Sequence, residues 1–225
     1  MRIFRPFMNG CRHKLVLFDL DGTLLDTLDD LSDAVNYAMQ KRGFSFHTRE
    51  EYMTMVGHGV RNLVLQALPE DRQKDDALVD AALADFKAYY TAHIDVKTRP
   101  YPGMQELVRE LDRKGVRMGI ASNKFQEGTE YLVDKFFPGI PFVAVLGNRP
   151  GYPLKPDPEI VGEVLRRAAV GREDAVMVGD SATDMRTAEN GGIEGIAVSW
   201  GYRKMEKGQA GPKVVDSAQE LLSLL

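Results

Sequence analysis

Short apolar runs that alternate with helical patterns are the feature of this sequence that most limits its fold. Each run is rich in Val, Ile and Leu and is long enough for one strand, and the stretches between the later runs show helical periodicity. Strands that alternate with helices are typical of a parallel sheet with helices on both faces, so we predict an α/β protein. The expected strands lie at residues 14–19, 116–122, 142–147, 175–180 and 195–200, and the expected helices at 103–114, 127–136, 158–169, 182–190 and 217–225.

The stretch from residue 28 to residue 95 departs from this alternation. It shows helical periodicity throughout and contains no convincing strand. The motif VKTRPYPG at 96–103 follows it, and its two prolines and one glycine end the last helix and stiffen the returning chain. We therefore expect two domains: a core built from residues 1–27 and 96–225, and a helical domain of residues 28–95 inserted after the first strand.

Composition excludes several classes of function. The 225 residues carry a net charge of -4 with scattered Lys and Arg, so we expect no nucleic-acid partner. Cys11 is the single cysteine, which excludes an internal disulfide and a thiolate zinc cluster, as is usual in a reducing compartment. No stretch has 18 uninterrupted apolar residues, and the first residues contain no apolar stretch of signal-peptide length. We therefore expect no membrane partner and a cytoplasmic location, with the chain acting as a monomer or a homodimer.

Polar side chains gather where the expected strands end. Ligands of open parallel sheets bind beyond the carboxyl ends of the strands, so residues at this edge are candidates for a site. The opposite edge offers Arg12, His13 and two glycines instead, which argues against turn formers placed at random. The polar residues expected at the carboxyl edge are Asp19, Asp21, Ser122, Asn123, Lys155, Asp180 and Asp184.

The acids of this set suit a hard cation. Asp19, Asp21 and Asp180 supply the oxygen ligands that Mg²⁺ prefers and that zinc and copper do not. Asp184, one helical turn beyond Asp180, would face the same ion directly, or through a water or a lysine contact. A magnesium ion that keeps several waters takes a phosphate as a further ligand. We therefore expect Mg²⁺ as cofactor and a small phosphorylated metabolite as substrate.

The two aspartates after the first strand can divide the work of phosphoryl transfer. Asp19, fixed by the end of the strand, is the candidate nucleophile that forms an aspartyl-phosphate. Asp21 is placed two residues on to protonate the leaving oxygen and then to activate water. The turn through Gly22 and Thr23 offers backbone amides that can cradle the phosphate.

Three further residues complete this scheme. The hydroxyl of Ser122 and the amide of Asn123 would hold the phosphoryl oxygens in line, and the ammonium of Lys155 would offset the repulsion between two anions. Each has a simpler alternative. Ser122 and Asn123 are also typical of a helix cap, and Lys155 could be a solvated loop charge, although prolines stiffen its loop.

A loop in the helical stretch is a second candidate for substrate contact. Gly57 and Gly59 let a backbone approach a ligand, and Arg61 can bind a carboxylate through two hydrogen bonds. The alternative is that the glycines only separate two helices and that Arg61 is a solvated charge. His58, between the glycines, has no assigned role.

Four motifs in this order resemble those of the haloacid dehalogenase superfamily of phosphohydrolases. They are DLDGT at 19–23, Ser122 with Asn123, Lys155, and GDSATD at 179–184. The resemblance implies a Rossmann-like core with an inserted helical cap that closes over the site and selects substrates. Within the superfamily the sequence is most similar to bacterial phosphoglycolate phosphatases, through VGHGVRNLVLQAL at 56–68, TRPYPG at 98–103 and SWGY at 199–202.

We therefore predict an Mg²⁺-dependent phosphoric monoester hydrolase with phosphoglycolate as the leading substrate. Asp21 argues for phosphate esters, because the dehalogenases of the superfamily lack this second aspartate. Gly179 stands where β-phosphoglucomutases usually carry Glu, which favours hydrolysis. The alternatives are a β-phosphoglucomutase-like phosphosugar mutase, a phosphatase for pyrophosphate or another small phosphate, and a non-catalytic protein that uses the fold as a phosphorylated switch or a binding module.

Overall fold

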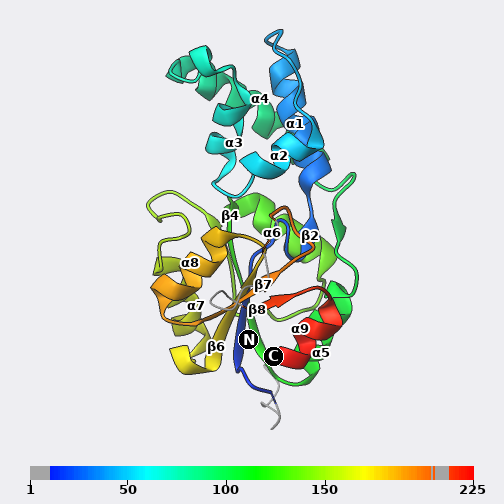
Figure 1. Cartoon of the computed structure of the whole chain (residues 1–225), viewed down its shortest axis with the longest axis vertical. Helices are drawn as coiled ribbons and strands as arrows, with labels where there is room; N and C mark the ends of the chain where they lie inside the picture. The colour runs from blue at the N-terminus through cyan, green and yellow to red at the C-terminus, as the bar shows by residue number, and fades with distance from the viewer. Residues whose placement is uncertain (1–10, 204, 206–212) are drawn as a thin grey trace.

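A sheet of six parallel strands lies at the centre of the structure (Figure 1). The computed structural model describes residues 11–203, 205 and 213–225. Within these residues the strand order is β5-β4-β1-β6-β7-β8, and each neighbouring pair is parallel, which confirms the predicted α/β fold. The strands are β1 (Leu15–Phe18), β4 (Arg117–Phe125), β5 (Ala144–Asn148), β6 (Ala175–Gly179), β7 (Glu194–Val198) and β8 (Lys213–Val215).

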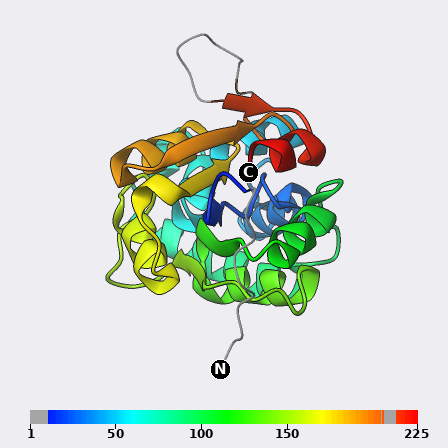
Figure 2. The same cartoon turned by 90° about the horizontal axis from the view of Figure 1, so that it is seen from below.

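Helices cover both faces of this sheet, as Figure 2 shows from below. Successive side chains of a strand point to opposite faces, so Leu15 and Leu17 of β1 join one apolar cluster and Val16 and Phe18 join the other. All four are fully buried, which explains why this run is apolar throughout. The first cluster packs against α7 (Glu159–Ala168) and α8 (Ala182–Gly191), and the second against α5 (Met104–Arg113), α6 (Gln126–Phe136) and α9 (Ala218–Leu224).

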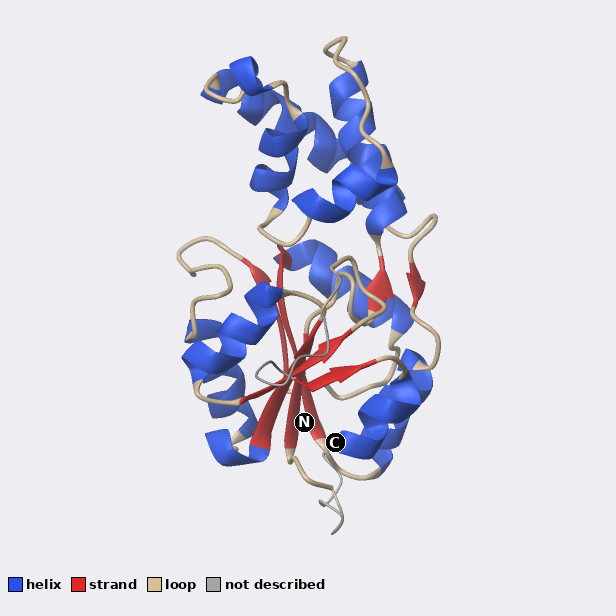
Figure 3. Cartoon of the chain, in the orientation of Figure 1, coloured by secondary structure: helices blue, strands red, loops and turns tan. Residues whose placement is uncertain are grey.

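Residues 28–95, called the helical segment below, form helices and connecting loops without a strand. These helices lie beyond the carboxyl ends of the sheet strands, at the top of Figures 1 and 3. Apolar residues from different helices, such as Val35, Val64 and Phe86, are fully buried in one cluster that continues into the sheet. The helices are α1 (Leu28–Gln40), α2 (Arg49–Met55), α3 (Val60–Ala67) and α4 (Asp76–His93), with the short 3₁₀ helix η1 (Glu70–Arg72).

Three short strands and one 3₁₀ helix were not expected from the sequence. β2 (Leu25–Asp26) and β3 (Arg99–Pro100) pair antiparallel where the chain leaves and re-enters the core. β8 adds a sixth strand to the sheet, and η2 (Arg172–Asp174) precedes β6. Elements of two or three residues are too short to show a period in the sequence, so pairing with distant residues defines them.

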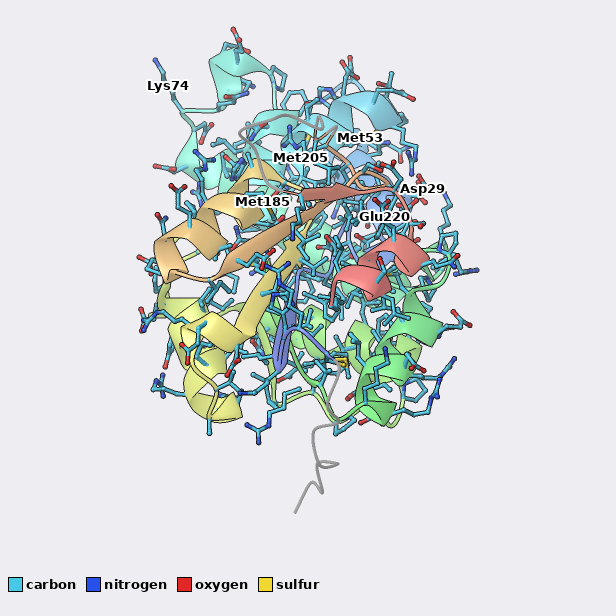
Figure 4. The ribbon with its side chains drawn as sticks, turned by 60° about the horizontal axis from the view of Figure 1, so that its bottom comes forward. Asp29, Met53, Lys74, Met185, Met205 and Glu220 are labelled. Carbon is cyan, nitrogen blue, oxygen red and sulfur yellow. The ribbon has the colours of Figure 1, made fainter. Side chains whose placement is uncertain are left out.

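Many charged residues lie on the outer surface, whereas a smaller set, including Asp19, Lys155 and Asp180, is buried. Asp29, Lys74 and Glu220, labelled in Figure 4, are exposed, and Lys74 projects from the outline of the molecule in that view. In the described parts of the chain, no helix combines the length and the apolar character that crossing a membrane requires.

Candidate active site

Parallel pairing brings the predicted site positions to one edge of the sheet. Phe18, the last residue of β1, lies opposite Ile120 of β4 and Val178 of β6. Asp19 therefore emerges beside β4, which continues to Phe125, and Asp180 follows the end of β6 directly. The edge of the sheet where strand order reverses is thus where the acids meet, as the rule for open parallel sheets requires.

Three aspartates, called the acidic trio below, form the centre of the site. Asp19, Asp180 and Asp184 are buried, and each offers a carboxylate oxygen within 4.8 Å of the others. Lys155 connects two of them, because its Nζ lies 3.0 Å from Oδ1 of Asp19 and 2.6 Å from Oδ1 of Asp184. Ser181 holds Asp184 through a capping box at the start of α8, in which the N–H of Ser181 donates to Oδ2 of Asp184 at 3.1 Å and the N–H of Asp184 donates to the hydroxyl of Ser181. The hydroxyl of Ser181 also donates to Oδ2 of Asp184 at 2.6 Å.

Burial and mutual repulsion change the proton affinities of these groups. Burial raises the pKa of Asp19 to about 7, although Lys155 opposes the rise. Burial also raises the pKa of Asp180 to about 8, with the charges of Asp184 and Asp19 adding to it. Burial by itself lowers the pKa of Lys155, but the carboxylates of Asp184 and Asp19 raise it further than burial lowers it. The trio therefore holds more negative charge than one lysine balances.

The donor set of the trio fits a hard divalent cation. The three carboxylates supply oxygen ligands only. Among the described residues, Lys155 is the one cation that forms ion pairs with them. Oxygen-rich acidic sites of this kind bind Mg²⁺ or Ca²⁺ rather than softer metals. Asp19, Asp180 and Asp184 can therefore hold a metal ion.

Asp21, which we also expected at the metal, lies outside this trio. Its Oδ1 accepts a hydrogen bond from the hydroxyl of Thr27 at 2.7 Å, and the ammonium of Lys124 lies 3.2 Å away. Lys124 is itself buried and donates to the hydroxyl of Tyr90 at 2.6 Å. Burial lowers the pKa of Lys124, and Asp21 opposes this. The second aspartate is thus held by a set of partners of its own.

Asn123 connects the helical segment with the loop that carries Lys155 instead of capping a helix. Its Nδ2 donates to the carbonyl of Gly57 at 3.0 Å, and its Oδ1 accepts from the backbone N–H of Lys155 at 2.8 Å. α6 begins at Gln126 without a side-chain cap, so the helix-cap alternative is wrong. Ser122 lines the same pocket as the trio, with its hydroxyl accepting from the backbone N–H of Lys124 at 3.3 Å.

The turn after β1 does not offer the amide cradle that we expected. The N–H of Gly22 donates to the carbonyl of Leu25 at 2.9 Å, and the N–H of Thr23 donates to that of Leu20 at 3.3 Å. Both amides are therefore used inside the turn. Thr23 is fully buried, and its hydroxyl has no partner among the residues that the structure describes.

The helical segment closes the pocket over the acids with one apolar wall. Gly57 lines this pocket, as expected, but Arg61 does not. The guanidinium of Arg61 lies on the outside of the segment, 3.2 Å from Asp76 and 3.1 Å from Asp80, so the structure does not bring it to the acids. His58 is exposed and does not line the pocket. The apolar wall consists of Leu31, Val56, Val60 and Leu63.

Lys124, Tyr202 and Arg203 also line the pocket, although none of them was among the site residues expected from the sequence. Tyr202 donates its backbone N–H to Oδ2 of Asp180 at 2.7 Å, and its hydroxyl accepts from the N–H of Thr27 at 2.7 Å. The signal for Lys124 was its place directly after Ser122 and Asn123. The signal for the other two was their place just beyond the expected strand at 195–200.

Comparison with known proteins agrees with this arrangement. The model of the family of haloacid dehalogenase-like hydrolases matches residues 16–198, which is most of the chain. The chain belongs to this family.

Its relatives in the family are similar over most of their length. A phosphoglycolate phosphatase of Mesorhizobium japonicum is 33% identical over 211 residues, which cover 93% of each chain. Phosphoglycolate phosphatase 1 of Pseudomonas aeruginosa is 33% identical, and the match covers 99% of this chain and 83% of the relative. The crystal structure of a putative phosphoglycolate phosphatase from Lactobacillus delbrueckii superposes with a TM-score of 0.86 at 34% identity, covering 95% of this chain and 99% of that one.

Proposed function

We propose that this haloacid dehalogenase-like hydrolase releases phosphate from a small phosphate monoester, with phosphoglycolate as substrate and Mg²⁺ as cofactor. The position of Asp19 carries the proposal, because its carboxylate lies inside the pocket, in the acidic trio and 3.0 Å from the ammonium of Lys155. A carboxylate held in this way is equipped to attack phosphorus. The two curated relatives described above are phosphoglycolate phosphatases, which supports the choice of substrate.

The first half of the reaction transfers the phosphoryl group to the enzyme. A carboxylate oxygen of Asp19 attacks phosphorus and the bond between phosphorus and the ester oxygen breaks. Asp21 enters this step in its protonated form and donates its proton to that oxygen, so that it leaves as an alcohol. Among the described residues, the hydrogen bonds to Asp19 fall on Oδ1, from the N–H of Leu20 at 2.7 Å and from Lys155. Oδ2 is therefore the oxygen that we assign to the attack.

The second half returns the enzyme to its starting state. Water attacks phosphorus of the aspartyl-phosphate, and Asp21, now ionised, takes the proton of that water. The bond between phosphorus and Asp19 breaks, which releases inorganic phosphate and the free carboxylate. Thr27 and Lys124 hold Asp21 in both halves. A divalent ion held by the acidic trio would supply positive charge against the phosphate dianion and keep the carboxylates ionised.

We infer that residues 28–95 act as a cap over a core of residues 1–27 and 96–225. The hydrogen bond from Asn123 to the carbonyl of Gly57 supports this, because it connects the two parts beside the site. The apolar wall of the helical segment would exclude water from the bound ester. A cytoplasmic location and a monomeric or homodimeric state stay predictions.

Gly179 supports hydrolysis over the mutase alternative. A Cβ atom at this position would lie 2.3 Å from the Cβ of Asp184, so no larger side chain fits without moving the trio. The glutamate that β-phosphoglucomutases usually carry here therefore has no room in this chain.

Phosphate release from a panel of esters tests the proposed function. We expect the highest kcat/KM for phosphoglycolate among phosphoglycolate, pyrophosphate, a nucleoside monophosphate and glucose 1-phosphate. A chelator should abolish release, and added Mg²⁺ should restore it. A rate of phosphate release that does not change when the chelator is added would contradict the metal-dependent mechanism. Conversion of glucose 1-phosphate into glucose 6-phosphate would show a mutase instead.

Replacing Gly22 tests how closely the turn fits the trio. Its φ is +82°, and a Cβ atom there would lie 2.5 Å from Oδ2 of Asp180. We expect Gly22→Ala to lower kcat roughly 100-fold, because small displacements of reacting groups have effects of this size. Gly43→Ala is the matched control: its φ is +71°, but nothing lies within 4 Å of the added atom. Equal kcat values for the two variants would contradict the prediction.

A further inference from the structure

Three cations line the pocket, and two of them already have carboxylate partners. Lys155 lies against Asp19 and Asp184, and Lys124 lies against Asp21. These two are also buried, with side chains only 1–2% exposed. Their charges are therefore balanced by the protein before a substrate binds. Arg203 is the third cation.

Arg203 differs from these lysines because its partners are neutral. It follows β7 and reaches the helical segment, where its Nη2 donates to the carbonyl of Thr54 at 2.6 Å and to that of Val56 at 3.0 Å. Both carbonyls lie at the end of α2. Within the described residues, Arg203 forms no ion pair, and its Nη1 and Nε donate no hydrogen bond. Among the described residues, the contacts of Arg203 thus leave the charge of its guanidinium without a carboxylate partner and leave N–H donors for a further anion.

We propose that Arg203 binds a second anionic group of the substrate, a carboxylate at the end away from the phosphoryl group. The proposal rests on the proposed function and deepens it: the enzyme would prefer phosphate monoesters that carry a carboxylate. A guanidinium binds a carboxylate through two hydrogen bonds, which gives both strength and direction.

The rest of the pocket makes this assignment specific. The apolar wall of the pocket, formed by Leu31, Val56, Val60 and Leu63, offers a carboxylate no compensation for lost water. The carboxylates of the trio would repel a second anion. Arg61, the arginine that we first considered for this role, is bound to Asp76 and Asp80 outside the pocket. Arg203 is the one guanidinium that lines the pocket among the described residues.

The contacts of Arg203 also place the bound carboxylate between the two parts of the protein. Thr54 and Val56 belong to the helical segment, whereas Arg203 extends from the sheet edge. A carboxylate held by this guanidinium would therefore favour the arrangement in which the helical segment lies over the acids. A neutral ester would gain no such contact.

A pair of substrates that differ only in this group tests the proposal. Phosphoglycolate carries the carboxylate, and 2-hydroxyethyl phosphate has a neutral alcohol in its place. We expect Arg203→Met to lower kcat/KM for phosphoglycolate by about 30-fold or more, mainly through KM, and to change that for the alcohol less than about twofold. Arg203→Lys should retain part of the preference, because it keeps the charge and loses the planar fork.

Two further variants, Arg109→Met and Arg61→Met, separate the loss of carboxylate binding from structural damage. Arg109→Met removes an exposed arginine of α5 and should leave both substrates unaffected. A drop of equal size for both substrates in Arg203→Met would overturn the proposal, since a residue that only holds α2 would act in this way. A changed preference in Arg61→Met but not in Arg203→Met would also overturn it.

The wild-type enzyme supplies the last arm of the test. If it hydrolyses both esters with equal kcat/KM, the carboxylate is not recognised, and this proposal is wrong while the phosphatase function stands. If it releases phosphate from no ester with Mg²⁺ present, the proposed function is wrong and the proposal falls with it.

Discussion

Asp19→Asn is expected to lower kcat for phosphoglycolate by at least about four orders of magnitude while the protein stays folded. Asparagine has nearly the shape of aspartate, but its amide cannot form the phosphoryl bond of the proposed intermediate. Steady-state phosphate release with saturating Mg²⁺ measures the loss. Mass spectrometry should find a phosphorylated peptide containing residue 19 in the wild type and none in the variant.

The same variant should not be less stable than the wild type when no metal is bound. The pKa of Asp19 is raised to about 7 in the folded protein, above its ordinary value of 3.8, chiefly by burial. An acid whose folded pKa is raised reduces stability as pH rises between these two values, and the reduction is complete above the higher one. The Asp19→Asn change removes this contribution, so in chelator at pH 8 the melting temperature of the variant should equal or exceed that of the wild type.

Asp134→Asn is the matched control for both measurements. Asp134 is an exposed residue of α6, and the change is the same removal of one carboxylate charge. The Asp134→Asn variant should have the kcat and the melting temperature of the wild type. Phosphate release by Asp19→Asn at the rate of this control would show that Asp19 is not the nucleophile.

The strands that the sequence predicts well are those buried on both faces. β1 and β6 are apolar at every position and buried at every position, so each appears as a short continuous run. β2 and β3 consist of two residues each, and β8 of three. Their existence depends on a partner elsewhere in the chain, which no local pattern contains.

The candidate site likewise contains residues that the sequence predicts and residues whose place depends on distant contacts. Asp19, Asp180 and Asp184 meet because parallel strands end at one edge, a rule that applies to the sequence directly. The burial of Lys124 follows from Tyr90, which belongs to the helical segment and is 34 residues away in the chain. Lysine is usually exposed, so no local pattern predicted its position beside Asp21.

The place of Arg203 shows the same limit over a greater distance. Its carbonyl partners at Thr54 and Val56 lie 149 and 147 residues earlier in the chain. Arg61 is closer in sequence to the loop at Gly57, yet two aspartates of α4 hold it outside the pocket. Which arginine faces the acids thus depends on how the helical segment packs on the core.

Lys155→Met is expected to lower kcat about 1,000-fold and to destabilise the fold by about 3–5 kcal/mol near pH 8. The side chain of Lys155 is 2% exposed, and its ammonium lies against Asp19 and Asp184. Methionine fills a similar volume but leaves both carboxylates without this cation. Denaturant unfolding in chelator and steady-state phosphate release with Mg²⁺ measure the two effects.

The pH dependence of Lys155→Met separates loss of charge from loss of packing. Lys155 opposes the rise in the pKa of Asp19, so its removal should raise that pKa above about 7 and move the acidic limb of the kcat profile to higher pH. The ion pair between Lys155 and Asp19 stabilises the wild type at pH values above the folded pKa of Asp19 and below that of Lys155. The difference in free energy of unfolding between the wild type and Lys155→Met should therefore shrink as pH falls below about 7. A difference in stability that is the same at pH 5 and pH 8 would show that packing, not charge, is lost.

Two control variants make the comparison specific to the charge at this position. Lys87→Met makes the same change at an exposed residue of α4 and should alter neither activity nor stability. Lys155→Arg keeps the positive charge, so it should retain most of the stability at pH 8. Its planar guanidinium cannot place one nitrogen 3.0 Å from Asp19 and 2.6 Å from Asp184 without moving the trio, so its kcat should stay well below that of the wild type. Stability would then follow the charge at residue 155, whereas turnover would follow the position of that charge beside the attacking carboxylate.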